Sequence, residues 1–329
     1  MPTTMNMLMR SAHRALLVVC LALVVQGCAV LTPQTVALRG ARPAGLPDAA
    51  ELTAVPFFPQ EDYQCGPAAL ATILDFAGLK LTPEQLAGEV YLPERHGSLQ
   101  VEMLASPRRH GMVSYELAPR LADVLREVAA GNPVVVLQDN GVGPFSLWHY
   151  AVIVGYDFSR AELYLRSGPK QRLVKSFGAF EYTWHAGRHW AMVALPPARI
   201  PETATQDRYR SAVSAMERSP DRAAARDAFA AFLARWPDDE AAAVGLANSQ
   251  HALGNLREAE AVLRRAAAQH PDSVPVLNNL AQALDDQGKG EEALAVAERA
   301  LRLGGPFQDA VRDTRDTIFR RLRAASGKG

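Results

Sequence analysis

The chain has 329 residues, of which 48% are hydrophobic, and its 35 Lys and Arg residues are balanced by 35 Asp and Glu residues. This length is enough for about two domains, each with its own core. A formal net charge of zero gives no electrostatic reason to expect a nucleic-acid partner. Function is therefore expected to lie in individual residues rather than in overall charge.

The segment 1–27 has the pattern of a secretory signal. Arg10 and Arg14 precede an apolar run over 15–25, which is too short to span a membrane comfortably. The run leads into Val25-Gln26-Gly27-Cys28, which resembles the signal of a bacterial lipoprotein with Cys28 as the lipidated cysteine, although Gln26 is less usual there than a small residue. The alternative is a simple signal peptide or anchor helix in which Cys28 is incidental.

The residue after Cys28 is Ala29 rather than an aspartate, and in Gram-negative lipoproteins this implies sorting to the outer membrane. We therefore expect a lipid-anchored protein of the cell envelope that faces the periplasm. Residues 28–54 are rich in Pro, Gly, Ala and Thr without a sustained hydrophobic period, which predicts a tether.

Cys65 has no predicted disulfide partner. Cys20 is removed with the signal and Cys28 carries lipid, which leaves Cys65 alone in an oxidising compartment. The apolar run after Gly66-Pro67 predicts a buried helix that begins at the cysteine, where unpaired backbone N–H groups stabilise a thiolate. A nearby histidine would then activate a nucleophile. The alternative is an inert buried cysteine.

The first domain is predicted over 55–197. Helical patterns follow Cys65, Thr82, Ser98 and Pro119. Apolar β-branched runs typical of strands come next, at 134–138, 149–156, 163–166, 173–176 and 191–195. Helices followed by antiparallel strands predict an α+β domain. This layout resembles papain-like folds, in which the nucleophile lies on an N-terminal helix and the histidine begins a strand of the sheet.

His149 is the candidate partner of Cys65 among the eight histidines. It stands between Trp148 and an apolar strand, and an imidazole can act as base and as acid near neutral pH. The alternative is a structural histidine at the start of a strand.

Four segments together resemble the bacteriocin-processing double-glycine cysteine peptidases and their stand-alone relatives. These are Gln60, Cys65-Gly66-Pro67-Ala68, Gly97-Ser98-Leu99 and the run from His149 to Asp157. The resemblance covers about Val55 to Pro196. It implies that Cys65 is the nucleophile, that His149 is the general acid/base and that Gln60 helps to bind the oxyanion. One comparable oxyanion donor contributes about 2.7–4 kcal/mol.

The residue that orients His149 stays open. The family uses an aspartate, usually just before a proline on the next strand, and Leu165-Arg166-Ser167-Gly168-Pro169 has Ser167 in that place. A serine can accept the imidazole N–H but cannot stabilise an imidazolium as a carboxylate does. Asp157 is the other candidate, although an acid that follows Gly155-Tyr156 is more typical of a β-turn.

The chain repeats itself after 204. Pro237 recurs as Pro271 and Gly254 as Gly288, and this spacing of about 34 residues is the period of tetratricopeptide repeats. We therefore expect an all-α tetratricopeptide-repeat solenoid over 204–306, followed by a capping helix and tail over 307–329. The recurring residues disfavour generic helical hairpins.

These features predict a membrane-anchored cysteine peptidase that cleaves a peptide or protein substrate, with a protein partner recruited by the repeats. The combination also resembles a proteobacterial subgroup of these peptidases. One alternative is a non-catalytic peptide-binding or assembly module on a peptidase-like fold, and Ser167 motivates it. Transfer chemistry on the same residue pair is another. The sequence has no metal-binding motif and no glycine-rich phosphate loop, so no cofactor and no metal are expected.

Overall fold

The computed structural model describes residues 32–59, 64–141 and 144–326. Two predicted functional residues, Cys28 and Gln60, lie outside the described residues. The described chain forms two compact units. The first takes in the residues up to Ser98 together with Leu117–Val193, and the second takes in Leu99–Glu116 together with the residues from Ala194 onward.

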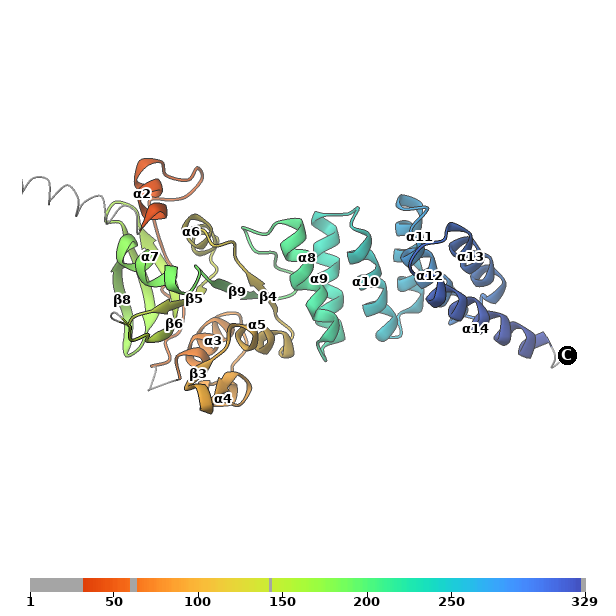
Figure 1. Ribbon diagram of the computed structural model, residues 1–329, viewed down its shortest axis with the longest axis horizontal. Helices are drawn as coiled ribbons and strands as arrows, with labels where there is room; N and C mark the ends of the chain where they lie inside the picture. Colours follow the sequence, from red (N-terminus) through yellow and green to blue (C-terminus); the bar gives the residue numbers. More distant parts are fainter. Residues whose placement is uncertain (1–31, 60–63, 142–143, 327–329) are drawn as a thin grey trace, which may run out of the picture. The chain divides into compact units, whose positions relative to one another are not determined.

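An antiparallel sheet forms the frame of the first unit (Figure 1). Its strands are β1 (Ala49–Glu51), β5 (Val134–Asp139), β6 (Trp148–Asp157), β7 (Glu162–Ser167), β8 (Lys170–Ser176) and β9 (Ala191–Leu195). The order is β9-β5-β6-β7-β8, and β1 also pairs with β6. Val134 of β5 lies opposite Ile153 of β6, and the middle of both strands is buried. Continuous β-branched runs of this kind are typical of strands that are covered on both faces.

The helices of the first unit complete its core. They are α2 (Pro33–Gly40), α3 (Cys65–Phe76), α4 (Pro83–Val90), α6 (Leu121–Ala129) and α7 (Phe177–Ala186), with the 3₁₀ turn η1 (Pro93–Arg95) and the short strand pair β2 (Tyr91–Leu92) and β3 (Gly97–Ser98). The consecutive residues of α3 from Gly66 to Leu74 are all buried. A helix that is apolar on all sides belongs inside a core, and α3 packs against β6 there.

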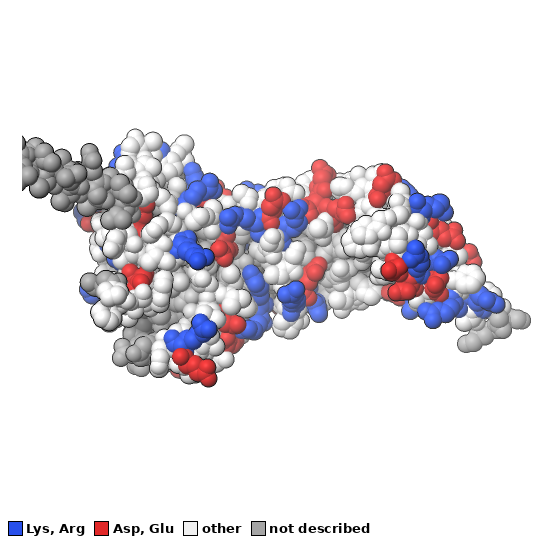
Figure 2. Space-filling view, in the orientation of Figure 1, with Lys and Arg blue, Asp and Glu red and all other residues white. Residues whose placement is uncertain are grey.

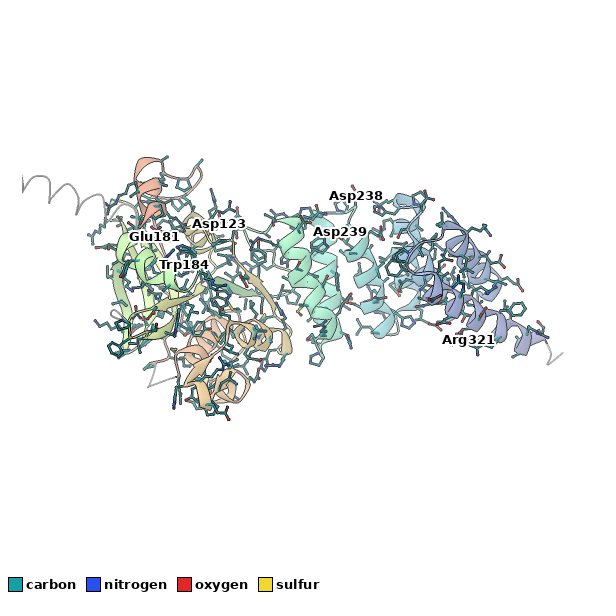
Figure 3. All side chains as sticks on the ribbon, viewed as in Figure 1. Asp123, Glu181, Trp184, Asp238, Asp239 and Arg321 are labelled. Carbon is teal, nitrogen blue, oxygen red and sulfur yellow. The ribbon has the colours of Figure 1, made fainter. Side chains whose placement is uncertain are left out.

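The segment predicted as a tether contains regular structure. The Glu181 carboxylate on α7 accepts hydrogen bonds from the backbone N–H groups of Gln34 (2.9 Å) and Thr35 (2.6 Å), in the first turn of α2. An anionic acceptor at a helix N-terminus satisfies N–H groups that have no partner within the helix. Figure 3 labels Glu181 on α7. From residue 33 onward, therefore, the chain is part of the folded unit.

The second unit begins with α5 (Gln100–Arg109) and β4 (Val113–Glu116). Both contact the chain that leads into the repeats, because Ser219 Oγ donates to the carbonyl of Arg108 (2.7 Å) and the Tyr115 ring packs edge-on against Tyr209. Residues 99–116, predicted as part of the first domain, therefore pack with the first helical segment of the range predicted for the repeats.

The rest of the second unit is helical, as predicted. Its elements are α8 (Gln206–Ser214), η2 (Ala215–Arg218), α9 (Arg222–Arg235), α10 (Glu240–Ala252), α11 (Leu256–Gln269), α12 (Val274–Asp285), α13 (Gly290–Leu303) and α14 (Gln308–Ser326). Gly254 and Gly288 have φ of +80° and +76°, a backbone conformation that favours glycine. Their recurrence in the sequence therefore marks the turn inside each repeat.

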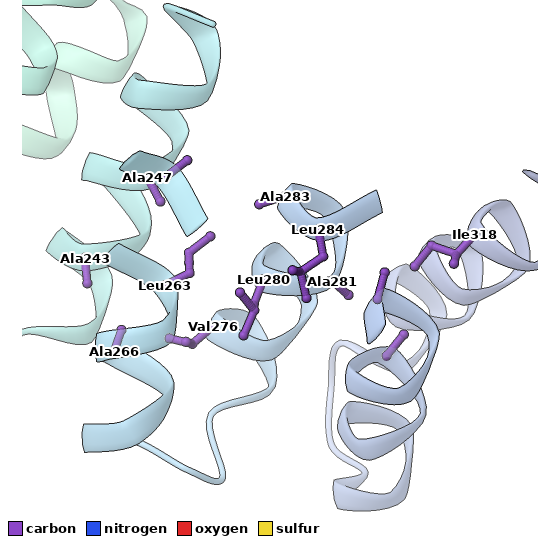
Figure 4. Packing of buried hydrophobic residues seen from close by; sticks show 13 residues of the cluster. Ala243, Ala247, Leu263, Ala266, Val276, Leu280, Ala281, Ala283, Leu284 and Ile318 are labelled. Carbon is purple, nitrogen blue, oxygen red and sulfur yellow. The ribbon is translucent and has the colours of Figure 1, made fainter. Parts of the chain in front are cut away.

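Small residues line the interior of the repeats. Ala243, Ala247 and Leu263 pack with residues of the next helix pair, and Ile318 of α14 covers the end of the cluster (Figure 4). Alanines allow neighbouring helices to approach closely, which gives a continuous core along the stack.

Charged side chains of both signs are interspersed over the face drawn in Figure 2. No helix among the described residues is long and apolar enough to cross a bilayer.

Candidate active site

Cys65 is the first residue of α3 and is half-buried. Burial raises the pKa of its thiol, and hydrogen bonding by the backbone amides of Tyr150 and Gly66 opposes that rise only in part. Tyr150 follows His149 directly in β6, so the start of α3 and the start of β6 meet at the sulfur. The predicted position of Cys65 at the first turn of a helix is confirmed.

The His149 imidazole is held by Ser167. Its Nε2 lies 2.8 Å from the Oγ of Ser167, which ends β7 and is 8% exposed. Burial, together with the positive charge of Lys175, lowers the pKa of His149 to about 4. The structure thus places the Ser167 hydroxyl within hydrogen-bond distance of the imidazole.

Asp157 lies at the opposite end of β6 from His149. The intervening strand corresponds to about 26 Å. The Asp157 carboxylate accepts hydrogen bonds from the hydroxyl of Ser159 (2.6 Å) and the backbone N–H of Arg160 (3.1 Å), and these bonds hold its pKa below the usual value. Asp157 therefore serves the turn between β6 and β7, and Ser167 is the partner of His149.

Lys175 on β8 is the charged residue that acts on His149. Its ammonium donates to Gln138 Oε1 (2.8 Å), Thr183 Oγ1 (3.0 Å) and Asn140 Oδ1 (3.2 Å). All three acceptors are uncharged. Burial lowers the pKa of Lys175, but three hydrogen bonds satisfy every proton of an ammonium group.

These groups favour a neutral pair at rest. The thiol of Cys65 has a raised pKa and the imidazole of His149 a lowered one, each mainly because of burial. Each unit of pKa between proton donor and acceptor corresponds to about 1.4 kcal/mol. Burial of both groups therefore favours the thiol–imidazole pair over the thiolate–imidazolium pair.

Residues 52–191 match the model of the Peptidase C39 like family. Two models of the tetratricopeptide repeat match residues 215–274 and 245–306. The chain carries a C39-peptidase-like domain followed by tetratricopeptide repeats. Among curated proteins, none matches the chain.

Solved structures similar to the chain include a C39-like peptidase from Bacillus anthracis, at 16% identity and a TM-score of 0.39, which covers 47% of this chain and 100% of that one. The tetratricopeptide-repeat domain of Sgt2 from Aspergillus fumigatus is 21% identical with a TM-score of 0.35, and covers 40% and 86% of the two chains. The Yersinia enterocolitica type III secretion chaperone SycD, in complex with a peptide of the translocator YopD, is 18% identical with a TM-score of 0.34, and covers 37% and 98%.

An exposed apolar loop adjoins His149 in the C39-like domain. Phe145, Leu147 and Trp148 are 80%, 62% and 51% exposed. The Asp139 carboxylate accepts the backbone N–H groups of Leu147 (2.7 Å) and Gly141 (2.9 Å), and so holds the two ends of the loop together. Large apolar side chains that are exposed next to a reactive group offer contact area for an apolar part of a substrate.

The tetratricopeptide repeats contain a groove of about 550 Å³ lined by α10, α11, α12 and α14. Arg321 contacts Asp285 and Asp286 there, and His251 Nε2 lies 2.8 Å from Asp286. Figure 3 labels Arg321 on α14. Three carboxylates, those of Asp285, Asp286 and Asp313, line the groove against one arginine, so its lining is acidic.

Lys175, Gln138 and Thr183 were not predicted from the sequence. Gln138 ends a run of apolar residues in β5 and lies directly opposite His149 in the β5–β6 register. Pairing those two strands around their loop would have placed a polar side chain beside His149. Lys175 carries no such signal, because it is one of several polar residues on an edge strand. Among the described residues, no group of three or more His, Cys, Asp or Glu side chains is arranged to hold a metal ion.

Proposed function

We propose that the C39-like domain is a cysteine peptidase that cleaves peptide bonds in a peptide or protein substrate. The observation that carries the proposal is the meeting of Cys65, at the first turn of α3, with the start of β6, where His149 is fixed by Ser167. The exposed loop of Phe145, Leu147 and Trp148 favours substrates that present an apolar side chain close to the scissile bond.

In the proposed reaction, the Nε2–H group of His149 donates a hydrogen bond to Ser167 Oγ and keeps its proton. The lone pair of Nδ1 accepts the proton of the Cys65 thiol. The sulfur of Cys65 bonds to the carbonyl carbon as its S–H bond breaks, and the carbonyl electron pair moves to oxygen. The C–N bond then breaks, and His149 returns the proton to the leaving amine. The oxygen of a water molecule then bonds to the acyl carbon while His149 takes up one of its protons. The C–S bond breaks, and His149 returns that proton to the sulfur of Cys65.

Gln60 is part of the same proposal as the donor to the developing oxyanion. A neutral amide that donates to that oxygen lowers the barrier without adding charge. Replacing Gln60 with Ala is expected to slow cleavage about 10²–10³-fold, because removal of one comparable donor has that effect.

The test is cleavage of a defined library of peptides by the full chain, followed by mass spectrometry. Cys65→Ala should leave every peptide intact, whereas Cys65→Ser should retain a small residual rate. Peptides with an apolar side chain should be cleaved first. Equal cleavage by the unmodified chain and Cys65→Ala would show that the activity comes from elsewhere.

A second candidate is a non-catalytic module that holds a peptide. The hydroxyl of Ser167 in place of a carboxylate favours it, as does the neutral state of His149. In that case labelled library peptides bind the full chain and Cys65→Ala equally, and neither protein cleaves them. Transfer of the acyl group to an amine instead of water would appear in the same spectra as a product of higher mass.

The repeats are proposed to recruit a protein partner through the groove that Asp286 and Arg321 line. Arg321→Glu leaves Asp285 and Asp286 without their cation and should weaken any complex that uses this groove. Cleavage of short peptides should stay unchanged, because the repeats lie in a different compact unit from Cys65.

Lipid attachment at Cys28 is the proposed anchor, with the protein facing the periplasm from the outer membrane. Helix α2 begins at Pro33, so the connection from the lipid to the folded unit measures at most about 18 Å. In a bacterial host supplied with labelled palmitate, the chain should take up label and Cys28→Ser should not. Equal labelling of both proteins would contradict the anchor.

A further inference from the structure

Lys175 lies in a cage of uncharged acceptors in the first unit. Gln138 Oε1 accepts both from Lys175 Nζ (2.8 Å) and from the hydroxyl of Thr183 (2.9 Å), and Asn140 supplies the third acceptor. Gln138 is 1% exposed. Within the described part of the chain, no carboxylate acts on this ammonium. Three uncharged acceptors therefore hold a half-buried cation in place.

The cage lies next to the candidate base. Gln138 on β5 is directly opposite His149 on β6, and side chains at such positions have Cβ atoms about 4.5–5.5 Å apart on the same face. The positive charge of Lys175 opposes a second positive charge on the imidazole.

Three other described neighbours of His149 are uncharged at neutral pH. Burial raises the pKa of the Cys65 thiol on α3 and of the Tyr150 phenol on β6, so both stay protonated. Ser167 on β7 contributes a hydroxyl. Asp139 precedes the loop, pairs with Trp148 in the ladder and directs its carboxylate to backbone N–H groups of that loop.

We propose that Lys175 is a positioning residue of the Cys65–His149 site. Burial is the main cause that keeps the imidazole neutral and the caged ammonium reinforces it, so that His149, hydrogen-bonded to Ser167, acts as a base toward a neutral thiol and does not stand as the cation of a preformed ion pair. This inference rests on the peptidase function proposed above. It implies a nucleophile that forms only during attack on a bound substrate, and hence a thiol that reacts slowly with small electrophiles at neutral pH.

The experiment follows the protonation of His149 by NMR in the full chain with isotope-labelled histidine, assigned by comparison with His149→Gln. The unmodified chain should show a pKa of about 4 for His149. Lys175→Met should raise it by about one unit, and Lys175→Arg should restore the low value. Ser167→Asp should raise it by about one to three units, because an opposite charge stabilises the imidazolium. Lys170→Met is the matched control, since it removes the same charge from an exposed position on the same strand, and it should leave the pKa unchanged.

Alkylation of Cys65 by iodoacetamide gives a second readout. In the unmodified chain the rate should rise through a single ionisation above the usual thiol pKa. Ser167→Asp should alkylate at least about tenfold faster at pH 7. A His149 pKa near 6.5 in the unmodified chain, or one that Lys175→Met does not move while Lys175→Met still folds, would overturn the inference.

The two proposals fail in different ways. If the His149 pKa responds as expected and no peptide is cleaved, the positioning role stands and the peptidase function fails. If peptides are cleaved and the pKa ignores Lys175, the peptidase function stands and the positioning role fails. If circular dichroism shows that Lys175→Met does not fold, the His149 pKa values of Lys175→Arg and Ser167→Asp test the inference instead.

Discussion

Lys175 in the first unit and Glu260 in the second are both ionisable side chains inside hydrogen-bonded clusters, but their partners differ in charge. Glu260 is 6% exposed and accepts from Lys289 Nζ (2.5 Å) and Arg264 Nε (2.8 Å). Lys175 donates to an amide oxygen on Gln138, another on Asn140 and a hydroxyl. The buried charge of Glu260 is thus compensated by opposite charge, whereas the half-buried charge of Lys175 is held by uncharged acceptors.

The difference bears on the positioning role proposed for Lys175. Burial raises the pKa of Glu260, but the bonds from Lys289 and Arg264 outweigh it and bring the pKa to about 2. The ion pairs there connect α11 to α13 and need no further role. In the proposal, the charge of Lys175 helps to keep the His149 imidazole neutral. Groups with perturbed pKa values are found at reactive sites more often than elsewhere.

The largest expected effect comes from removing the base. His149→Ala should lower the rate of peptide cleavage about 10²–10⁴-fold, which is the usual contribution of a general acid/base. His185→Ala is the control, because this histidine is exposed on α7 and its ring packs against His189 rather than in the Cys65 site. The rates are compared by mass spectrometry on the same peptide library. Equal losses in both variants would mean that the site has been assigned to the wrong histidine.

The next effect concerns stability and contrasts the two clusters directly. Glu260→Ala leaves Lys289 and Arg264 without their acceptor and should lower the free energy of unfolding of the repeats by about 1–3 kcal/mol. Both cations are partly exposed to solvent, so water compensates part of the loss. Lys175→Met should change the stability of the first unit by less than about 1 kcal/mol, because a half-buried charge held by uncharged acceptors has been replaced by an apolar chain.

Hydrogen exchange in urea measures both variants, since it follows the amides of each compact unit separately. Faster exchange in α11 and α13 of Glu260→Ala, with unchanged exchange in β5 and β6 of Lys175→Met, is the expected pattern. A larger loss in Lys175→Met than in Glu260→Ala would reverse the comparison and make the Lys175 cluster a structural one.

Acid should act on the compensated cluster with a defined sign. Glu260 has a lower pKa in the folded chain than in the unfolded one, so its stabilisation is fully present above about pH 4.5 and is lost as the pH falls toward 2. The exchange protection of α11 should therefore weaken over this window. Glu260→Gln should lack this part of the pH dependence, and an identical profile in both proteins would show that another carboxylate is responsible.

The repeats were predictable from the sequence because the residues that define each turn and helix cap act within a short stretch of the chain. Gly254 and Gly288 recur at positions where the backbone needs positive φ, and Asp239 and Ser273 recur as helix caps at equivalent positions of successive repeats. Such requirements act within a short stretch of the chain, and the same solution therefore returns in each repeat.

Of the candidate site, the sequence could predict only where Cys65 and His149 lie in the fold. Cys65 was marked by the helix that follows it and His149 by its strand. The choice between Ser167 and Asp157 required the register and direction of β6 and β7, which no local pattern encodes. Lys175 was missed for the same reason, because it lies on β8, beyond β7 in the chain, and reaches Gln138 through the folded sheet.

The smallest expected effect comes from a charge on β6, the strand of His149, that lies far from the imidazole. It tests whether such a charge affects cleavage or the pKa of His149. Asp157→Asn removes a carboxylate whose bonds to Ser159 and Arg160 lie in the β6–β7 turn. An asparagine side chain can accept the same bonds. Cleavage should therefore change less than about twofold and the His149 pKa should stay at about 4. Loss of an orienting carboxylate would lower the pKa of His149, so a rise toward 6.5 would not indicate such a role. A large loss of cleavage with unchanged stability would assign the orienting role to Asp157 in place of Ser167.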